Sequence, residues 1–274
     1  MSSFTLGFVA RLNFHSNSIW AVIKAEVRKI VRSPLFWVSV LGMAFIPMML
    51  GVLMFIKKYP ELAQSSILLS KASMMPGNGD WPAYLALFTQ MICGVGLLGF
   101  GFIASWLFGR EYSDRTIKDL LALPLARSSI VMGKFFVMIC WCWLLFAIAT
   151  VVMLGIGLIL HLSGWSWHYF LHFLSILSAA TLMNIGLCMS AAFVACLAQG
   201  YLAAIGFVVV TLLMANFVGM LGFGPYYPWG IPMLYAIKGI DYAYLGAESL
   251  IIVIMTGIVG LIATLYWWRF ADQN

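Results

Sequence analysis

Residues 110–134 read REYSDRTIKDLLALPLARSSIVMGK, the longest charged interruption between two uncharged apolar runs. The stretch holds five of the fifteen Lys and Arg residues and three of the nine acids. Within it, Ile117, Leu120 and Leu121 are spaced i, i+3, i+4, which makes one apolar stripe on a helix. The stretch therefore predicts a short amphipathic helix between two long apolar segments.

Residues that favour helix ends flank this predicted helix. Ser113 or Thr116 can cap its start, because a Thr-x-x-Asp pattern resembling a capping box begins at Thr116. Pro124 ends the helix, since proline has no N–H to donate and disfavours helical geometry at the preceding residue. Ser128 or Ser129 can then cap the next helix.

The composition of the chain decides its class. Of its 274 residues, 64% are hydrophobic and 9% are charged, whereas a soluble domain is about 45–50% apolar and about 25% charged. Residues 1–274 are therefore expected to form a single polytopic membrane domain, with no room for a soluble catalytic domain. The net charge of +6 is explained by the Lys and Arg residues that membrane proteins collect on their cytoplasmic side, so it does not indicate nucleic-acid binding.

Six stretches contain no Asp, Glu, Lys or Arg, and each reaches the roughly 20 residues that a helix needs to cross the hydrocarbon core. They are residues 35–56, 84–109, 135–160, 169–198, 202–224 and 249–268. All five cysteines lie inside these stretches, so we expect small buried hydrophobes rather than disulfides. The expected fold is an all-α polytopic membrane protein with six transmembrane helices and a cytoplasmic segment, 110–134, after the second span.

The distribution of Lys and Arg predicts the orientation of these spans. An even number of spans places both termini on one side of the membrane. Eleven of the fifteen Lys and Arg residues fall in the segments on the side of the termini, and four fall in the segments on the other side. Because Lys and Arg accumulate in cytoplasmic loops, both termini are expected to be cytoplasmic.

Residues 1–34 are expected to be a cytoplasmic N-terminus ending in an amphipathic helix. Its apolar face comprises Trp20, Ile23, Val27, Ile30 and Val31, and its basic face comprises Lys24, Arg28, Lys29 and Arg32. Such a helix lies in the membrane interface with its cations on anionic headgroups, so membrane lipids are expected partners. Anchoring the chain and docking a partner protein are both compatible with this pattern.

Few polar side chains lie inside the predicted spans, and the most polar are Gln90, Asn184 and Asn216. Amides in a membrane usually hydrogen-bond across helices, so we expect them to hold helices together, with a place along a substrate path as the alternative. No acid or base lies in the middle of a span, which argues against a proton relay of buried carboxylates.

Gly101, Ser105 and Gly109 are spaced i, i+4, i+8 and make a stripe of small residues on the second predicted span. Such a stripe lets two helix backbones approach closely. The partner helix is expected to come from the same subunit or from a second copy. Residues 225–248 are aromatic and broken by proline, which predicts either a short re-entrant or interfacial helix or an aromatic belt at the outer surface.

His168 and His172 are spaced i, i+4 and could bind a metal or haem from one helix face. Interfacial histidines are the simpler interpretation, because no second histidine pair occurs in another span. No Gly-x-x-x-x-Gly-Lys-Ser/Thr phosphate loop occurs in the sequence either. The chain therefore has no recognisable means of hydrolysing a nucleotide.

Several short motifs flank the first two predicted spans. In chain order they are Glu26-x-Arg-Lys, Arg32-Ser-Pro34, Gly109-Arg-Glu111, Asp114-Arg-Thr116, Leu120-Leu121, Pro124, Arg127 and Lys134. Together with the layout of the spans, they resemble the type-two ABC transporter permeases. The resemblance is strongest to the bacitracin- and lantibiotic-type exporter permeases of bacteria.

This resemblance implies a separate cytoplasmic ATPase that binds ATP and Mg²⁺, while the chain itself binds no cofactor. It also implies a second permease copy, because such complexes contain two copies of each subunit. The segment after the second span would be a coupling helix in a groove of the ATPase, which suits the stripe of Ile117, Leu120 and Leu121. Glu111 and Thr116 would lie in or near that contact.

The resemblance further implies an exporter in the bacterial cytoplasmic (inner) membrane. Its cargo would be amphipathic, such as a peptide antibiotic or a lipid-linked molecule, and its role would include antibiotic resistance. Two alternatives stay open: a membrane redox or metal/haem-binding subunit that uses His168 and His172, and a non-transporting assembly subunit.

Overall fold

The computed structural model describes residues 19–59, 79–118, 122, 126–238 and 245–270. This part of the chain is α-helical and contains no strand. Residues 19–31 form an N-terminal helix. The further elements are α2 (Pro34–Lys58), α4 (Trp81–Met91), the π-helix η2 (Ile92–Gly96), α5 (Leu97–Ser113), α7 (Arg127–Ile159), α8 (Trp167–Leu197), α9 (Tyr201–Met220), the 3₁₀ helix η3 (Gly224–Tyr226), α10 (Ile231–Lys238) and α11 (Ala247–Phe270).

Six helices within the described ranges are long and apolar enough to cross a membrane. They are α2, the continuous run of α4, η2 and α5 over Trp81–Ser113, and then α7, α8, α9 and α11. The prediction of an all-α polytopic membrane protein is thereby confirmed.

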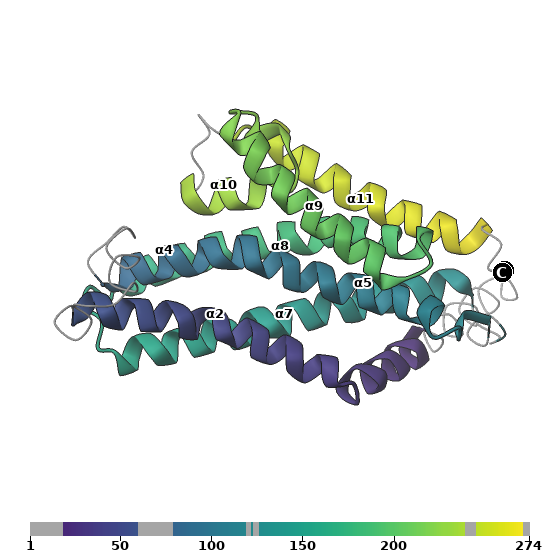
Figure 1. The fold of residues 1–274 in the computed structure, drawn as a ribbon, viewed down its shortest axis with the longest axis horizontal. Helices are drawn as coiled ribbons and strands as arrows, with labels where there is room; N and C mark the ends of the chain where they lie inside the picture. Colours follow the sequence, from purple (N-terminus) through teal and green to yellow (C-terminus); the bar gives the residue numbers. More distant parts are fainter. Residues whose placement is uncertain (1–18, 60–78, 119–121, 123–125, 239–244, 271–274) are drawn as a thin grey trace, which may run out of the picture.

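The long helices lie roughly side by side (Figure 1). Helix α8 packs against α5, α9 and α11, and α2 packs against α7. The core between them is apolar, and its fully buried side chains include the aromatic residues Tyr84, Phe88, Phe100 and Phe108. Helices α9 and α11 have most of their apolar surface exposed, as expected of helices that face lipid or another subunit.

Local capping sets the two ends of the first span. Ser33 accepts a hydrogen bond from the Leu35 N–H (3.2 Å) and Pro34 occupies the first turn, so α2 begins here after the bend that follows the N-terminal helix. At the other end of α2, Lys58 Nζ donates to the backbone carbonyls of Leu160 (2.7 Å) and His161 (2.9 Å). These bonds tie the end of α2 to the end of α7.

Helix α7 begins at Arg127, well before the predicted span over residues 135–160. The prediction placed the boundary at a charge, but Lys134 is buried inside the helix and does not interrupt it. The residue that caps α7 is Ala126, which has no capping side chain. The prediction that Ser128 or Ser129 caps this helix is therefore wrong, since both lie within its first turn.

Helix α10 lies at the end of the bundle opposite the N-terminal helix (Figure 1). It packs against α4 and α8, and Ile231 at its start is fully buried. The neighbouring loops are held by two bonds: the Tyr227 hydroxyl donates to Thr211 O (3.1 Å), and the Ser249 hydroxyl donates to Pro225 O (2.8 Å). Residues 225–248 thus contain a short helix, of the kind predicted as an alternative to an aromatic belt.

A π-helical turn interrupts the second span, and a buried amide compensates it. A π-turn shifts the backbone hydrogen-bond ladder and leaves carbonyls without their usual helical partners. The Asn184 side chain of α8 is fully buried and donates to the carbonyls of Ile92 (3.3 Å) and Cys93 (3.4 Å) in η2. Asn184 therefore stabilises α8 against the π-turn of the neighbouring span.

Replacing Asn184 by leucine should lower the free energy of unfolding by about 1–3 kcal/mol, because two buried carbonyls lose their donor. Asn216→Leu is the matched control, since Asn216 is exposed and its amide donates within its own helix, to Leu212 O. That control should change stability by less than about 0.5 kcal/mol. Unfolding by SDS in mixed micelles measures both, and equal effects would contradict the bridging role of Asn184.

Candidate functional site

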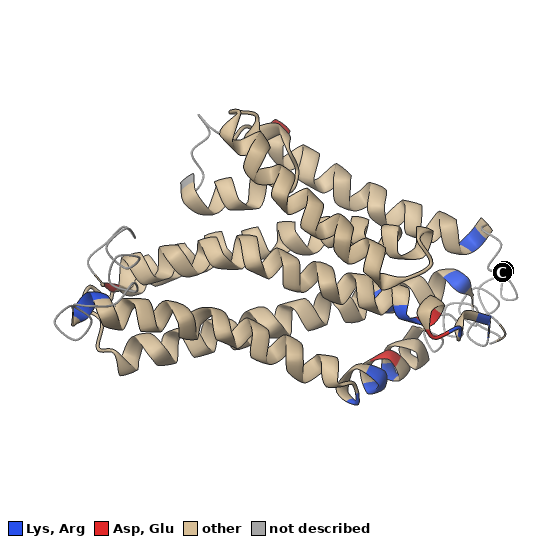
Figure 2. Cartoon of the chain, viewed as in Figure 1, with Lys and Arg blue, Asp and Glu red and all other residues tan. Residues whose placement is uncertain are grey.

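Five charged side chains from three helices gather at one end of the bundle. They are Glu26 and Lys29 of the N-terminal helix, Arg110 and Glu111 of α5, and Lys134 of α7. Figure 2 shows Lys, Arg, Asp and Glu crowded at this end, while the middle of the bundle is free of them in the residues drawn in colour. We refer to these five residues as the charge cluster.

Glu111 and Lys134 form the closest ion pair of the charge cluster. Lys134 Nζ lies 2.7 Å from Glu111 Oε2 and donates to Oε1 at 2.8 Å. The same ammonium donates to the backbone carbonyl of Leu107 (3.0 Å), so α5 supplies both of its strong acceptors. Lys29 Nζ reaches Glu111 Oε1 at 3.4 Å from the N-terminal helix.

Glu26 is the second carboxylate of the charge cluster. It lies 3.1 Å from Lys29 Nζ, 3.3 Å from Arg110 Nη2 and 3.5 Å from Lys134 Nζ. The Arg110 guanidinium is also stacked over the Trp106 ring, 4.4 Å from its centroid. Each carboxylate is therefore shared between cations from different helices.

The core of the charge cluster is removed from solvent. Lys134 is fully buried, and Glu26 and Glu111 are each 2% exposed. Burial by itself raises the pKa of the Glu26 carboxyl, but Lys134, Lys29 and Arg110 together outweigh it and hold this pKa below its ordinary value. Removing one partner from such a buried set leaves another charge uncompensated, which costs about 3–5 kcal/mol.

The lowered pKa of Glu26 predicts a pH dependence. A carboxylate with a depressed pKa stabilises the fold above its ordinary value, here 4.5, and loses that contribution as the pH falls through the lowered pKa. Wild type should therefore exceed Glu26→Gln in thermal stability at about pH 6, and this difference should shrink as the pH falls below 4.5. Thermal unfolding in detergent over this range measures it. A difference that stays constant or grows on acidification would contradict the ion pairs of Glu26.

The charge cluster also explains which face of the N-terminal helix is buried. Val22, Glu26 and Ile30, spaced i, i+4, i+8, face the bundle and are 6%, 2% and 4% exposed. Val22 packs so closely on α7 that a Cβ added to Gly133 would lie 2.7 Å from it. A sequence pattern that treats Glu26 as a solvated charge misses this stripe, because two of the three cations that compensate it come from α5 and α7.

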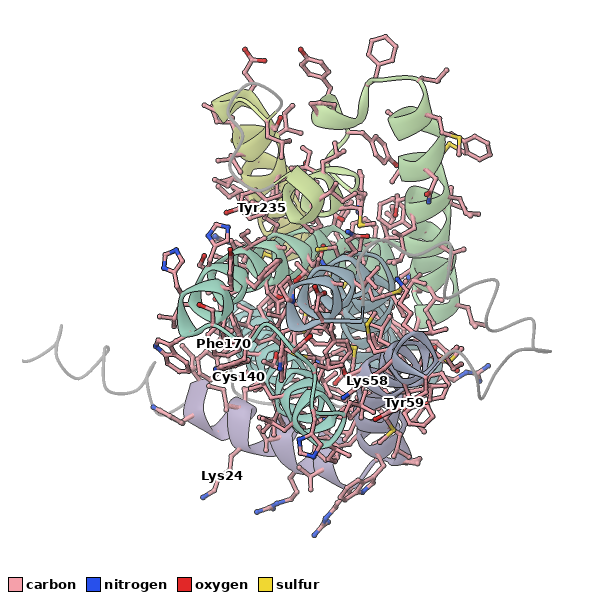
Figure 3. All side chains as sticks on the ribbon, turned by 90° about the vertical axis from the view of Figure 1, so that its left-hand side faces the viewer. Lys24, Lys58, Tyr59, Cys140, Phe170 and Tyr235 are labelled. Atoms are coloured by element: carbon pink, nitrogen blue, oxygen red, sulfur yellow. The ribbon has the colours of Figure 1, made fainter. Side chains whose placement is uncertain are left out.

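The residues predicted as the apolar face of this helix differ in how much of their side chains is exposed. Trp20 and Val27 are 64% and 44% exposed, while Ile23 is half-buried. Among the predicted basic residues, Arg28 and Arg32 are exposed, whereas Lys29 belongs to the charge cluster. Lys24 points away from the bundle (Figure 3). The helix thus packs on the bundle through one stripe and presents apolar and basic side chains outward.

The segment after α5 is attached to the charge cluster through the backbone of Glu111. The N–H of Thr116 donates to Glu111 O (2.9 Å) and that of Arg115 to Tyr112 O (3.2 Å), the two bonds of a Schellman motif. Arg115 takes the left-handed position with φ 57°. Ser113 donates to Gly109 O of its own helix, so it belongs to the end of α5.

The residues predicted to dock a partner have different surroundings. Thr116 is exposed, and Glu111 is buried in the charge cluster. Ile117 is 5% exposed and packs into the core of the chain itself, which differs from the expectation that it faces a partner. Leu120 and Leu121 lie outside the described residues.

The small-residue stripe of α5 packs within the subunit. A Cβ on Gly101 would lie 2.7 Å from Val208 of α9, and one on Gly109 would lie 2.5 Å from the backbone nitrogen of Tyr201. Ser105 donates to Gly101 O (2.7 Å) and is fully buried. Of the two partners considered for the stripe, α9 of the same chain is the one observed.

The remaining polar candidates are spread over the bundle. Gln90 is half-buried in α4. Asn216 lines a cavity of about 400 Å³ between η2, α9 and α10. His168 and His172 are both exposed on α8. The described part of the chain holds no group of three or more His, Cys, Asp or Glu side chains that could bind a metal, and its five cysteines are free thiols.

Comparison with known proteins fits this arrangement. The model of the ABC-2 family transporter proteins matches residues 22–216, which include the whole charge cluster. The bacitracin transport permease protein BCRB of Bacillus licheniformis is 28% identical over 186 residues, covering 68% of this chain and 88% of that protein. The match spans most of both chains, so the similarity extends beyond a local motif. The chain belongs to the ABC-2 family of transporter proteins.

Proposed function

We propose that this chain is the permease subunit of an ABC exporter, driven by a separate cytoplasmic ATPase that docks on residues 110–134. Family membership supports the permease role. One observation supports the proposed docking site: the exposed turn at residues 114–116 is hydrogen-bonded to Glu111, a member of the buried charge cluster. A force applied to this turn reaches three helices at once.

The charge cluster is the proposed route of that force. The turn is hydrogen-bonded to the backbone carbonyl of Glu111. The side chain of Glu111 pairs with Lys134 of α7 and with Lys29 of the N-terminal helix. Separating any one helix would leave a buried charge unpaired, at about 3–5 kcal/mol. The three helices are therefore proposed to move as a unit when ATP binding closes the ATPase pair, and to shift the permease between inward- and outward-open states.

Within this proposal, the residues of the docking segment take separate roles. Thr116 is exposed and is proposed to contact the ATPase. Leu120 and Leu121, from the apolar stripe predicted by the sequence, are proposed to contact it as well. Glu111 is proposed as a positioning residue that holds the turn in place, because it is buried and its charge is paired with Lys134. Ile117 anchors the segment to the permease core.

The remaining parts of the proposal rest on family membership and on the sequence. ATP and Mg²⁺ belong to the ATPase subunit, and a second permease copy completes the complex. The excess of Lys and Arg on one side supports cytoplasmic termini in the bacterial inner membrane. The proposed cargo is an amphipathic peptide antibiotic or a lipid-linked molecule, and its support is the similarity to a bacitracin transport permease.

Growth inhibition tests the export of a peptide antibiotic. A bacitracin-sensitive host expressing this chain with its ATPase should tolerate more bacitracin than the host alone. The same host with an ATPase lacking its phosphate-loop lysine, or with the permease alone, should not. Equal tolerance in all strains would contradict bacitracin as the cargo. Co-purification with an ATPase but no nucleotide-dependent change would favour the assembly subunit, and a haem absorbance band would favour the redox subunit.

A further inference from the structure

A cavity of about 520 Å³ opens between the start of α7 and the end of α11, at the same end of the bundle as the charge cluster. Ala126, Arg127 and Ser128 line it from α7, and Arg269 lines it from α11. Neither arginine belongs to the charge cluster or to the exposed turn at residues 114–116. The cavity is therefore a separate feature that the transport role leaves unexplained.

The two arginines bring positive charge to this cavity from distant parts of the sequence. Arg127 Nη1 donates to the Trp268 carbonyl (3.3 Å), which fixes the guanidinium and uses one of its five donors. The Arg269 guanidinium lies 5.3 Å from the centroid of the Phe270 ring. Among the described residues, neither Arg127 nor Arg269 has a carboxylate partner.

The start of α7 adds to this positive potential. Ser128 belongs to the first turn of this 33-residue helix, and the N-cap residue Ala126 provides no capping side chain. The N–H groups and the dipole of such a turn favour an anion. An anionic group in the cavity would therefore meet two guanidinium groups and a helix start.

The rest of the cavity is apolar and continues along the membrane-spanning face of α11. Ile262, Tyr266 and Phe270 are spaced i, i+4, i+8 and are 57%, 65% and 60% exposed. Leu265 lies between them in the same lining. The stripe leads from the arginines towards the middle of the span. A ligand that fits both parts has an anionic head and a hydrocarbon tail.

We propose that this cavity binds one anionic phospholipid, with its phosphate between Arg127 and Arg269 and an acyl chain along Ile262 and Tyr266. Basic pockets between transmembrane helices at the cytoplasmic surface suit such headgroups. An acidic side chain of a partner protein would fit the arginines, but it would leave the apolar stripe without a ligand. The lipid holds α7 and α11 together beside the docking segment.

The test uses the purified full-length chain and native mass spectrometry with added phosphatidylglycerol. Wild type is expected to retain one phosphatidylglycerol in preference to phosphatidylcholine with the same acyl chains. The double variant Arg127→Gln/Arg269→Gln should bind it about tenfold more weakly, because two cations near the headgroup are lost. Arg115→Gln/Lys118→Gln is the matched control, since it removes two exposed cations from the segment after α5, and it should bind phosphatidylglycerol like wild type.

A second variant guards against misfolding of the double variant. Tyr266 lies near the C-terminal end of α11 and lines the cavity together with Arg269. A carboxylate in Tyr266→Glu can pair with the arginines, so this variant should fold, and the carboxylate should displace the phosphate. Undiminished phosphatidylglycerol binding by either variant, or an equal loss in the control, would overturn the proposal. Two further outcomes would also overturn it: equal thermal stabilisation by inorganic phosphate, or release of the ATPase by the double variant while lipid binding is retained.

Discussion

Replacing Lys134 by methionine is expected to lower the free energy of unfolding by about 3–5 kcal/mol, the range for removing one partner of a buried ion pair. Methionine fills a similar volume, so the loss would come from the charge rather than from a cavity. Glu111 would lose its 2.7 Å ion pair, and the Leu107 carbonyl would lose its donor. SDS-induced unfolding in mixed micelles measures the change.

The control for this prediction is Lys24→Met, which removes the same charge from an exposed position on the N-terminal helix. Its effect should stay below about 0.5 kcal/mol. A double-mutant cycle with Glu111→Gln adds a second check: because the two residues are paired, the double variant should lose less stability than the sum of the single variants. Additive effects would contradict the pair.

The second large effect is expected at Gly109. An alanine Cβ there would lie 2.5 Å from Tyr201 N, 2.7 Å from Gly200 C and 2.7 Å from Tyr201 Cα. These are backbone atoms that cannot rotate away, so α5 would have to separate from the turn between α8 and α9. Gly109→Ala should lower the free energy of unfolding by about 1–3 kcal/mol or more, the range for overpacking.

Gly155→Ala is the matched control, because nothing lies within 4 Å of a Cβ at that position of α7. It should be neutral or stabilising by up to about 1 kcal/mol, since alanine is the better helix former. Thermal unfolding of both variants in the same detergent separates close packing from helix propensity. A destabilised Gly155→Ala beside an unaffected Gly109→Ala would contradict the packing described for α5.

The sequence predicted the helices well, because a span must be long and apolar and its composition is a local property. Its errors arose where a charge lies inside the protein. The charge-free pattern predicts that the third span starts at residue 135, because Lys134 precedes it, yet Lys134 is fully buried within α7. The apolar face predicted for the N-terminal helix does not include Glu26, yet Glu26 is central to the buried stripe of that helix. Partners that lie far apart in sequence make both burials possible.

The candidate site was predictable in its location but not in its contacts. The interruption over residues 110–134 begins at the end of α5 where the charge cluster lies, and the motif residues Glu26, Arg110 and Lys134 are members of that cluster. Only the three-dimensional arrangement shows that they converge. Similarly, the type of role expected of Asn184 agrees with its bonds across helices, but its partner, a π-turn, leaves no clear mark in the sequence.

The central claim is that an ATPase docks on the exposed turn after α5. A photo-crosslinking amino acid at Thr116 tests it in native membranes, and the matched control is the same group at Ser163, which is exposed at the opposite end of the bundle near the start of α4. Thr116 should crosslink to a protein that carries a nucleotide-binding phosphate loop, with a yield that changes with nucleotide, while Ser163 should not. A crosslink to that protein from Ser163, with none from Thr116, would contradict the account.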